Sequence, residues 1–368
     1  MLTALAFAGA TEPVFKTGNM LITTEGIDYL DIQGSKNLSG SIGIVTHDND
    51  EINVNYKMTA RAGSESQASR FLDLISLQLD NRLGNKAVLR IITPLDAPWQ
   101  GTNNQVSLEV LIGVPEKMGI KGNIQFMRLD INGPLTGVDL EAAYSAINLS
   151  DIQGLIDIST SFAPLQMSDI DGNIKIENRY GSIKASDLTI SDGNAIFQNT
   201  GGAIELSNIK GPVEAYTSYS PIEASDITAY EGTIVFRTSY SSIIVENVSG
   251  ELICETTFDS ISISDCSLTH GQSKIETSYS PITADFNKIT DSQLFIYNNY
   301  NNINIMLPRS LSSQVAAIVD NGGRIHTSDV PIRPTSLDTN HLEGYIGSGD
   351  NRIELKVTGI GAIEIKGR

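Results

Sequence analysis

Residues 217–225 read TSYSPIEAS, residues 238–246 read TSYSSIIVE, and residues 277–285 read TSYSPITAD. Three near-copies in one chain indicate an internal repeat, and a repeat decides the fold class before any single residue does. Glycines mark the repeat at positions 154, 172, 193, 211, 232, 250 and 271, so their intervals alternate between 18 and 21. Eleven positions after each glycine stands one aliphatic residue of a column: Leu165, Ile183, Ile204, Ile222, Ile243, Ile261 and Ile282, with Ile147 and Ile303 in the flanking units.

The apolar residues within each unit follow the period of a strand. The second and fourth positions after the glycine are apolar, as in Ile174 and Ile176, and side chains two apart share one face of a strand. A helical repeat would instead show a period of about 3.6 residues and abundant Ala, Leu, Glu and Lys. The sequence therefore predicts an all-β fold built on a parallel β-solenoid, a single-stranded β-helix of about nine coils with the alternating 18/21 spacing of the glycines.

The remaining segments give the predicted domain organisation. Residues 1–11 end in small residues, with Ala8 and Ala10 placed as in an A-x-A cleavage site. They are interpreted as a truncated export signal, and a frayed strand is the open alternative because a basic start is missing.

Three further segments follow. Residues 12–135 are predicted to form an N-terminal β-rich capping unit, in which SESQASRFLDLISLQLDNRLG (64–84) forms one helix, capped by Ser64 and closed by Gly84. The solenoid repeats occupy 136–306. Residues 307–368 then supply strands that close the other end, among them RIELKVTGIGAIEIKGR (352–368).

Composition limits the partners. The chain has 368 residues and a net charge of −18, which argues against sequence-independent binding to nucleic acid or to an anionic bilayer. No run approaches the roughly 18 apolar residues of a transmembrane helix, so no transmembrane segment is predicted. The partner is unknown from sequence, and a glycan or another cell-surface or envelope component is the candidate.

Two columns of the repeat are polar or aromatic. The sixth position is expected to form hydrogen bonds between coils and holds Thr160, Asn178, Asn199, Thr217, Thr238, Thr256, Thr277 and Asn298. The eighth position holds Phe162, Tyr180, Gly201, Tyr219, Tyr240, Phe258, Tyr279 and Tyr300. Because the second, fourth, sixth and eighth positions share one parity, the rings are expected to pack in the core, and a sugar- or peptide-binding strip is the alternative.

A third column, at position fifteen, is acidic: Asp169, Asp187, Asn208, Asp226, Asn247 and Asp265. We expect these side chains to bond their own backbone at a tight corner, with the Asn residues relieving charge repulsion, and Ca²⁺ chelation between coils is the alternative. Cys254 and Cys266 fall at core positions of one repeat and are predicted to be buried free thiols, with a local disulfide as the alternative.

Signals for catalysis are weak. The four histidines are scattered, and the metalloprotease, nucleophile-elbow and phosphate-loop patterns do not occur. HDND (47–50) is interpreted as a turn, and GSGDN (347–351) as a hairpin turn between strands. The sequence thus predicts a protein that is not an enzyme, with no catalytic, cofactor-binding or metal-binding residues.

About residues 105–368 resemble the bacterial putative adhesin family of β-helical domains, which is related to adhesin-head GIN-type domains. The resemblance is carried by the strand VSLEVLIGVP (106–115), the corners YGSIKAS (180–186) and TSYSPIEAS, and the closing GYIGSGDNRIELKVTGIGAIEIKG (344–367). It implies an exported protein, periplasmic, outer-membrane-associated or on the cell surface, without an established enzyme site.

We therefore expect a non-enzymatic adhesin or binding scaffold. The alternatives are a carbohydrate-active β-helix enzyme, either a polysaccharide lyase or a hydrolase, and a structural polymer stacked end to end.

Overall fold

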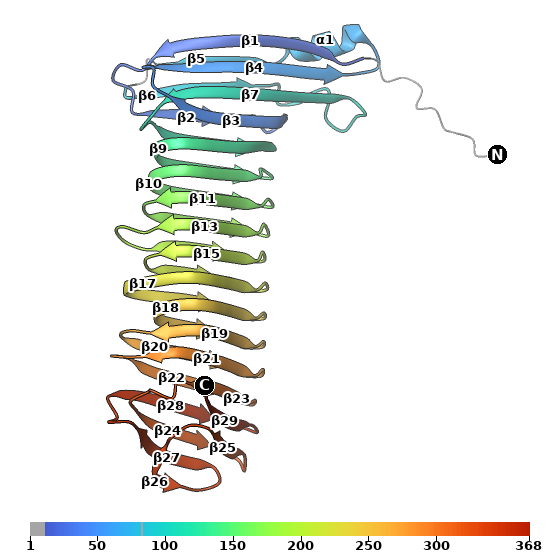
Figure 1. Cartoon of the computed structure of the whole chain (residues 1–368). Coiled ribbons are helices and arrows are strands. Elements are labelled where there is room, and N and C mark those ends of the chain that lie inside the picture. Colours follow the sequence, from blue (N-terminus) through green and yellow to red (C-terminus); the bar gives the residue numbers. More distant parts are fainter. Residues whose placement is uncertain (1–11, 82–83) are drawn as a thin grey trace, which may run out of the picture. The chain divides into compact units, whose positions relative to one another are not determined.

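The computed structural model describes residues 12–81 and 84–368, so the predicted export signal lies outside the described residues. These residues form 29 strands and one helix (Figure 1). The prediction of an all-β fold with one helix is confirmed. The chain divides into two compact units after Ile170.

In the first unit, antiparallel and parallel strand pairing coexist. Strand β4 pairs antiparallel with β1 and β7, whereas β2 pairs in parallel with β6 and β8, and β3 with β7 and β9. Parallel pairing therefore already begins N-terminal to residue 136. The elements are α1 (Glu65–Asp73), β1 (Val14–Thr23), β2 (Tyr29–Gln33), β3 (Ser39–His47), β4 (Glu51–Arg61), β5 (Ser76–Asp80), β6 (Lys86–Ile92), β7 (Gln105–Pro115), β8 (Gly119–Gln125), β9 (Met127–Ala143) and β10 (Ile147–Ser161), and β11 (Leu165–Asp171) crosses the division.

Helix α1 is shorter than predicted. Ser64 is its N-cap, as expected, and the Oγ of this residue accepts the main-chain N–H of Gln67 at 3.2 Å. The helix ends at Asp73, and Leu77 and Leu79 belong to β5, which pairs antiparallel with β6. The prediction of a helix closed by Gly84 is wrong because these leucines alternate with polar neighbours at the period of a strand.

In the second unit, the strands β12–β23, β28 and β29 pair in parallel with the equivalent segments of the neighbouring repeats, so two series of paired strands form. One contains β12, β14, β16, the ends of β17 and β18, β20, β22 and β28, and the other contains β13, β15, the starts of β17 and β18, β19, β21, β23 and β29. In Figure 1 the labelled strands of this unit follow one another along the unit in chain order from β13 to β22, namely β13, β15, β17, β18, β19, β20, β21 and β22.

The bounds of these strands are β12 (Ile174–Arg179), β13 (Ile183–Thr189), β14 (Ala195–Asn199), β15 (Ile204–Lys210), β16 (Val213–Tyr216), β17 (Ile222–Arg237), β18 (Ile243–Glu255), β19 (Ile261–Leu268), β20 (Gln272–Thr277), β21 (Ile282–Ile289), β22 (Gln293–Asn298), β23 (Ile303–Leu307), β24 (Ser313–Val319), β25 (Arg324–Ser328), β26 (Arg333–Leu337), β27 (His341–Ile346), β28 (Asn351–Val357) and β29 (Ala362–Gly367).

The aliphatic column stacks as its spacing requires. Ile222 pairs with Ile243, and Ile243 pairs with Ile261 on the next strand, and all three are at most 1% exposed. The column extends beyond the residues that the repeat count included, because Ile303 pairs with Ile363 of β29 and Ile363 pairs with Ile325 of β25. Stacking side chains of one shape in register allows the close packing that is typical of protein interiors.

The strands of residues 352–368 do not end the stack. Strand β28 pairs with β22 on one side and β24 on the other, and β29 pairs with β23 and β25. Strand β27 pairs antiparallel with β24, and β26 with β27, so β24–β27 lie beyond β28 and β29. In Figure 1 the C-terminus accordingly lies beside β22 and β23, and the N–H of Arg368 donates to the carbonyl of Leu307 at 2.8 Å.

The GSGDN segment is a crossing loop. It connects β27 to β28, and β24 lies between these two strands and pairs with both. The prediction of a hairpin turn is therefore wrong. The Oγ of Ser312 accepts the N–H groups of Ser348 and Gly349 at 3.1 and 3.0 Å, which ties the loop to the start of β24.

The core accounts for the two cysteines. Cys254 and Cys266 are free and buried, as predicted. Burial raises the pKa of the Cys254 thiol and raises that of Cys266 to about 12, so both remain protonated, weakly reactive hydrophobes. Among the helices of the described residues, none is long and apolar enough to span a bilayer.

Replacing Ile243 by Ala tests the aliphatic column. Removal of a fully buried aliphatic group leaves a cavity, so Ile243→Ala is expected to lower the free energy of unfolding by about 2–5 kcal/mol in urea titration. The matched control is Ile244→Ala, because Ile244 is the adjacent residue and points outwards. Equal losses in the two variants would contradict the register.

Candidate functional site

Five aromatic rings form a row on the surface of the second unit. Their centroids are 4.9–5.3 Å apart along the row, and neighbouring rings lie within 3–8° of parallel. Each ring-bearing residue is 48–65% exposed, so the prediction that these rings pack in the core is wrong. This aromatic ladder consists of Tyr219, Tyr240, Phe258, Tyr279 and Tyr300.

The rings face outwards because the strand stops before them. Thr277 is the last residue of β20 and is buried, and residues 278–280 then form a bend before β21 begins at Ile282. A bend breaks the alternation of side chains, so Tyr279 does not continue the inward parity of Thr277. The Ser and Pro residues that accompany the Tyr residues of this column are typical of turns, and they were the signal for this reversal.

Main-chain hydrogen bonds between successive corners set the spacing of the rings. The N–H of Tyr240 donates to the carbonyl of Ser218 at 3.0 Å, and the N–H of Tyr300 donates to Ser278 at 2.9 Å. Phe258 and Tyr279 make the same bond, each to the residue that precedes the ring of the previous repeat. The rings therefore stack because these bonds hold each ring-bearing corner against the corner of the preceding repeat. Each such corner is one rung of the aromatic ladder.

The buried polar column forms hydrogen bonds to the same corners from the core side. The Oγ1 of Thr277 donates to the carbonyl of Asp259 at 2.9 Å, and the Nδ2 of Asn298 donates to Ser280 at 2.8 Å. In both cases the acceptor is a corner carbonyl of the preceding repeat. The prediction of hydrogen bonds between successive repeats is confirmed, and the partners are main-chain groups that burial would otherwise leave unsatisfied.

A shorter row of the same kind occurs in the first unit. The rings of Phe126 and Tyr144 are stacked at 5.0 Å, and those of Tyr144 and Phe162 at 4.9 Å. All three residues adopt a left-handed backbone, with φ of 56–63°, which turns each side chain out of the strand. Exposed ring stacking is thus a property of both units.

A ladder of this geometry suits contact with a partner. Stacked rings cover one another's faces, so the row presents ring edges and the hydroxyls of Tyr219, Tyr240, Tyr279 and Tyr300 to solvent. Such side chains offer a large apolar area at a small cost in conformational entropy, and they are enriched at protein interfaces.

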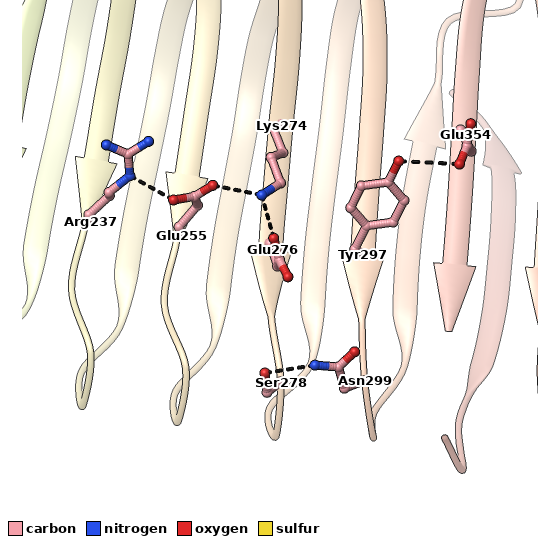
Figure 2. Close-up of polar contacts among 8 residues, drawn as sticks. All are labelled: Arg237, Glu255, Lys274, Glu276, Ser278, Tyr297, Asn299 and Glu354. Atoms are coloured by element: carbon pink, nitrogen blue, oxygen red, sulfur yellow. Dashed lines mark hydrogen bonds and ion pairs between the residues drawn. The ribbon is translucent and has the colours of Figure 1, made fainter. Parts of the chain in front are cut away.

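Ion pairs lie on the outward side of the strands that lead into these corners. Glu255 accepts from the Nε of Arg237 at 2.6 Å and from the Nζ of Lys274 at 2.9 Å, and Lys274 also pairs with Glu276 (Figure 2). Farther along, the hydroxyl of Tyr297 donates to a carboxylate of β28 at 3.2 Å. The cations of this cluster are thus paired within the protein.

The pKa values indicate structural ion pairs. Burial raises the pKa of Glu255, but the hydrogen bonds from Lys274 and Arg237 outweigh this effect and hold it below its ordinary value. A general acid requires the opposite shift, because it must stay protonated near neutral pH. This carboxylate therefore lacks the electrostatics of a proton donor.

The acidic column is held by side-chain hydrogen bonds between repeats. Asn208 donates to Asp187 at 2.5 Å, and Asn247 donates to Asp226 at 2.6 Å. The role of Asn in relieving repulsion is confirmed. The expected bonding of these asparagines to their own backbone is wrong, since each amide reaches the preceding repeat.

The end of the acidic column meets the C-terminal residue. Arg368 pairs with Asp265 and Asp285, and its hydrogen bond lowers the pKa of Asp265. Within residues 12–81 and 84–368, no group of three or more His, Cys, Asp or Glu residues is arranged to hold a metal ion.

No protein-family model and no curated protein matches this chain. One solved structure that is similar to it is the crystal structure of a putative cell adhesion protein from Clostridium sporogenes ATCC 15579, with 9% sequence identity and a TM-score of 0.21. The match covers 97% of this chain and 100% of the other.

Replacing Thr277 by Val tests whether the buried hydrogen bonds hold the corners of the aromatic ladder. The two side chains are nearly isosteric, but Val leaves the carbonyl of Asp259 without its donor, so the free energy of unfolding is expected to fall by about 1–3 kcal/mol. Thr283→Val on the exposed face of β21 is the control. A Thr277→Val protein as stable as the control would show that these bonds do not hold the corners.

Acid titration tests the Glu255 ion pairs. Because the folded-state pKa lies below the ordinary value of 4.5, these pairs stabilise the fold above about pH 4.5, and the contribution is lost as the pH falls through the folded-state pKa. Between about pH 6 and pH 3, the unfolding free energy of Glu255→Gln is therefore expected to fall less than that of the wild type. The exposed Glu223→Gln is the control, and an unchanged acid dependence in Glu255→Gln would refute the pairing.

Proposed function

We propose that this protein is a non-enzymatic, surface-exposed binding protein, an adhesin or scaffold of the cell envelope, that contacts its partner through the aromatic ladder. The observation that carries this proposal is the row of five stacked rings, each about half exposed. Exposure of large aromatic side chains to water is unfavourable, and contiguous exposed apolar surface on a folded protein marks an interaction site.

The proposal includes a parallel β-solenoid as the fold of the repeats. Its support is the regular register of the pairing, in which Ile204 pairs with Ile183 of the repeat before it and with Ile222 of the repeat after it. A strand that always pairs with the equivalent segment of the next repeat winds the chain into coils. Such a stack would present the successive corners of the second unit, and hence the rings of the aromatic ladder, on one side.

Charge favours a neutral or cationic partner. The net charge of the chain is −18, and the cations beside the ladder, Arg237 and Lys274, are already paired with carboxylates. Neutral glycans and protein components of an envelope fit this balance better than anionic polymers, whose binding relies on unpaired cations. An exported location agrees with the family that the sequence resembles.

The alternative of a carbohydrate-active enzyme requires two carboxylates with different protonation states beside one groove. Near the ladder, Glu255 is bonded by two cations, and its pKa is lowered. That environment favours a permanently charged group, so the binding role is the better account of this surface.

Binding of the labelled full chain to intact bacterial and animal cells, measured by flow cytometry, tests the proposal. The variant Tyr240→Ser/Tyr279→Ser removes two central rings and is expected to weaken binding at least about tenfold, the equivalent of about 1.4 kcal/mol. Tyr230→Ser removes an exposed ring outside the ladder and is expected to bind as the wild type does.

Two results would contradict the proposal. One is equal cell binding by the ladder variant and the wild type, with both shown to be folded by circular dichroism. The other is release of reducing or unsaturated ends from a polysaccharide panel, abolished by substitution of a single carboxylate, which would support the enzyme alternative.

A further inference from the structure

One repeat of the second unit carries no ring at the eighth position, where Gly201 stands. We call the corner of this repeat the empty rung. The corner of residues 199–204 lies between those of residues 178–183 and 217–222, as the parallel pairing of the flanking strands shows. Its eighth position is Gly201, whereas the neighbouring corners carry Tyr180 and Tyr219. Tyr219 stacks on Tyr240 on one side and faces the glycine rung on the other.

The empty rung leaves a space of about the right height for one ring. Strands are about 4.8 Å apart, so Tyr180 and Tyr219 start from backbones about 10 Å apart, and a ring held between two others needs about 7–8 Å. Tyr180 reaches towards Gly201, because a Cβ at position 201 would lie 3.0 Å from the Cδ1 of Tyr180. This lean brings the two walls closer to the separation of a three-ring sandwich.

Exposure agrees with this geometry. Tyr180 is 61% exposed and Tyr219 is 65% exposed, more than any other ring of the eighth-position column in this unit. Tyr300, which is the last ring of the aromatic ladder, is 57% exposed. The rings beside the empty rung therefore offer more accessible surface to an incoming group than the rest of the row.

The floor of the space has few hydrogen-bonding groups to offer. The carbonyl of Gly201 accepts from the Oγ of Ser220 at 2.8 Å, and the N–H of Gly202 donates to the Oδ1 of Asn199 at 3.2 Å. The amide of Asn199 in turn donates to the carbonyl of Gly181 at 2.6 Å. Because these groups are already paired, a sugar ring would lose hydration of its hydroxyls without replacing it, whereas a flat apolar ring would not.

From these observations we infer that the empty rung is a binding slot for one aromatic side chain of a partner polypeptide. The inserted ring takes the place that Gly201 leaves vacant and stacks between Tyr180 and Tyr219, as the rings of the ladder stack on one another. The inference rests on the proposed binding function and gives it a ligand chemistry: a protein segment that exposes Phe, Tyr or Trp.

The test uses N-acetyl-4-fluorophenylalaninamide as the probe and the full chain as the receptor, followed by ¹⁹F NMR. A fluorophenyl ring between two aromatic faces is shielded by both, so a saturable upfield shift is expected with the wild type. Gly201→Tyr fills the slot with its own ring and is expected to weaken probe binding at least about tenfold, the equivalent of about 1.4 kcal/mol. The backbone at Gly201 does not have the left-handed φ that would oppose this substitution.

Two further variants keep the test decisive if Gly201→Tyr does not fold. Tyr219→Ser removes one wall and is expected to reduce both the upfield shift and the affinity. Gly201→Ala adds only a methyl group, which must displace the Tyr180 ring slightly, and is expected to weaken binding less than Gly201→Tyr. Tyr230→Ser is expected to bind the probe as the wild type does.

Three outcomes would overturn the inference: no saturable binding by the wild type, equal binding by Gly201→Tyr and the wild type, or displacement of the probe by methyl glucoside at lower concentration than by N-acetylphenylalaninamide. Failure here differs from failure of the proposed function. If cell binding depends on Tyr240 and Tyr279 but the probe does not bind, the ladder remains a contact surface and only the slot is refuted. If the probe binds but cell binding is independent of the ladder, the slot stands and the adhesin role falls.

Discussion

Hydrogen bonds between successive corners hold the repeats of the second unit in register. From Thr217 to Asn298, the buried Thr or Asn of each rung donates to a corner carbonyl of the preceding repeat. Four of the ring-bearing residues donate their N–H to another such carbonyl. These bonds keep the turns aligned, so the aliphatic side chains that follow, such as Ile282 after Thr277, stack in register. The exposed rings are aligned by the same bonds, which means that one constraint organises both the core and the candidate binding surface.

Much of the fold could be predicted from the sequence because the repeat is a one-dimensional pattern. Equivalent positions of successive repeats pair with each other, and the core column needed only counting. The C-terminal strands could not be placed in this way. Ile363 stacks on Ile303 although the two are far apart in sequence, because β24–β27 precede β28 and β29 in the chain but lie beyond them in space. A periodic sequence pattern does not contain this information. The predicted C-terminal end of the helix was wrong for a local reason. Leu77 and Leu79 fit a helix or a strand equally well, and only the pairing of β5 with β6 decides between them.

The candidate site was harder to predict than the core, although all of its residues belong to a column that the repeat defines. The aromatic column is evident in the sequence, but the parity of the strand predicts rings inside the core only if it continues through the corner, where the chain in fact bends. The physical difference between Thr277 and Tyr279 lies in the intervening backbone, which leaves the strand and turns the second side chain to solvent. The role of Gly201 depends on this correction, because an empty rung matters only in a column of rings that solvent and a partner can reach.

Amide hydrogen exchange of the free chain measures whether successive corners are bonded to one another. The N–H groups of Tyr240, Phe258, Tyr279 and Tyr300 lie in exposed bends, where amides commonly exchange quickly, yet each donates to the preceding corner. We expect these four amides to exchange as slowly as those of the adjoining strands. Exchange as fast as that of unbonded loop amides would show that the corners are not fastened to one another and that the rings are not held in register.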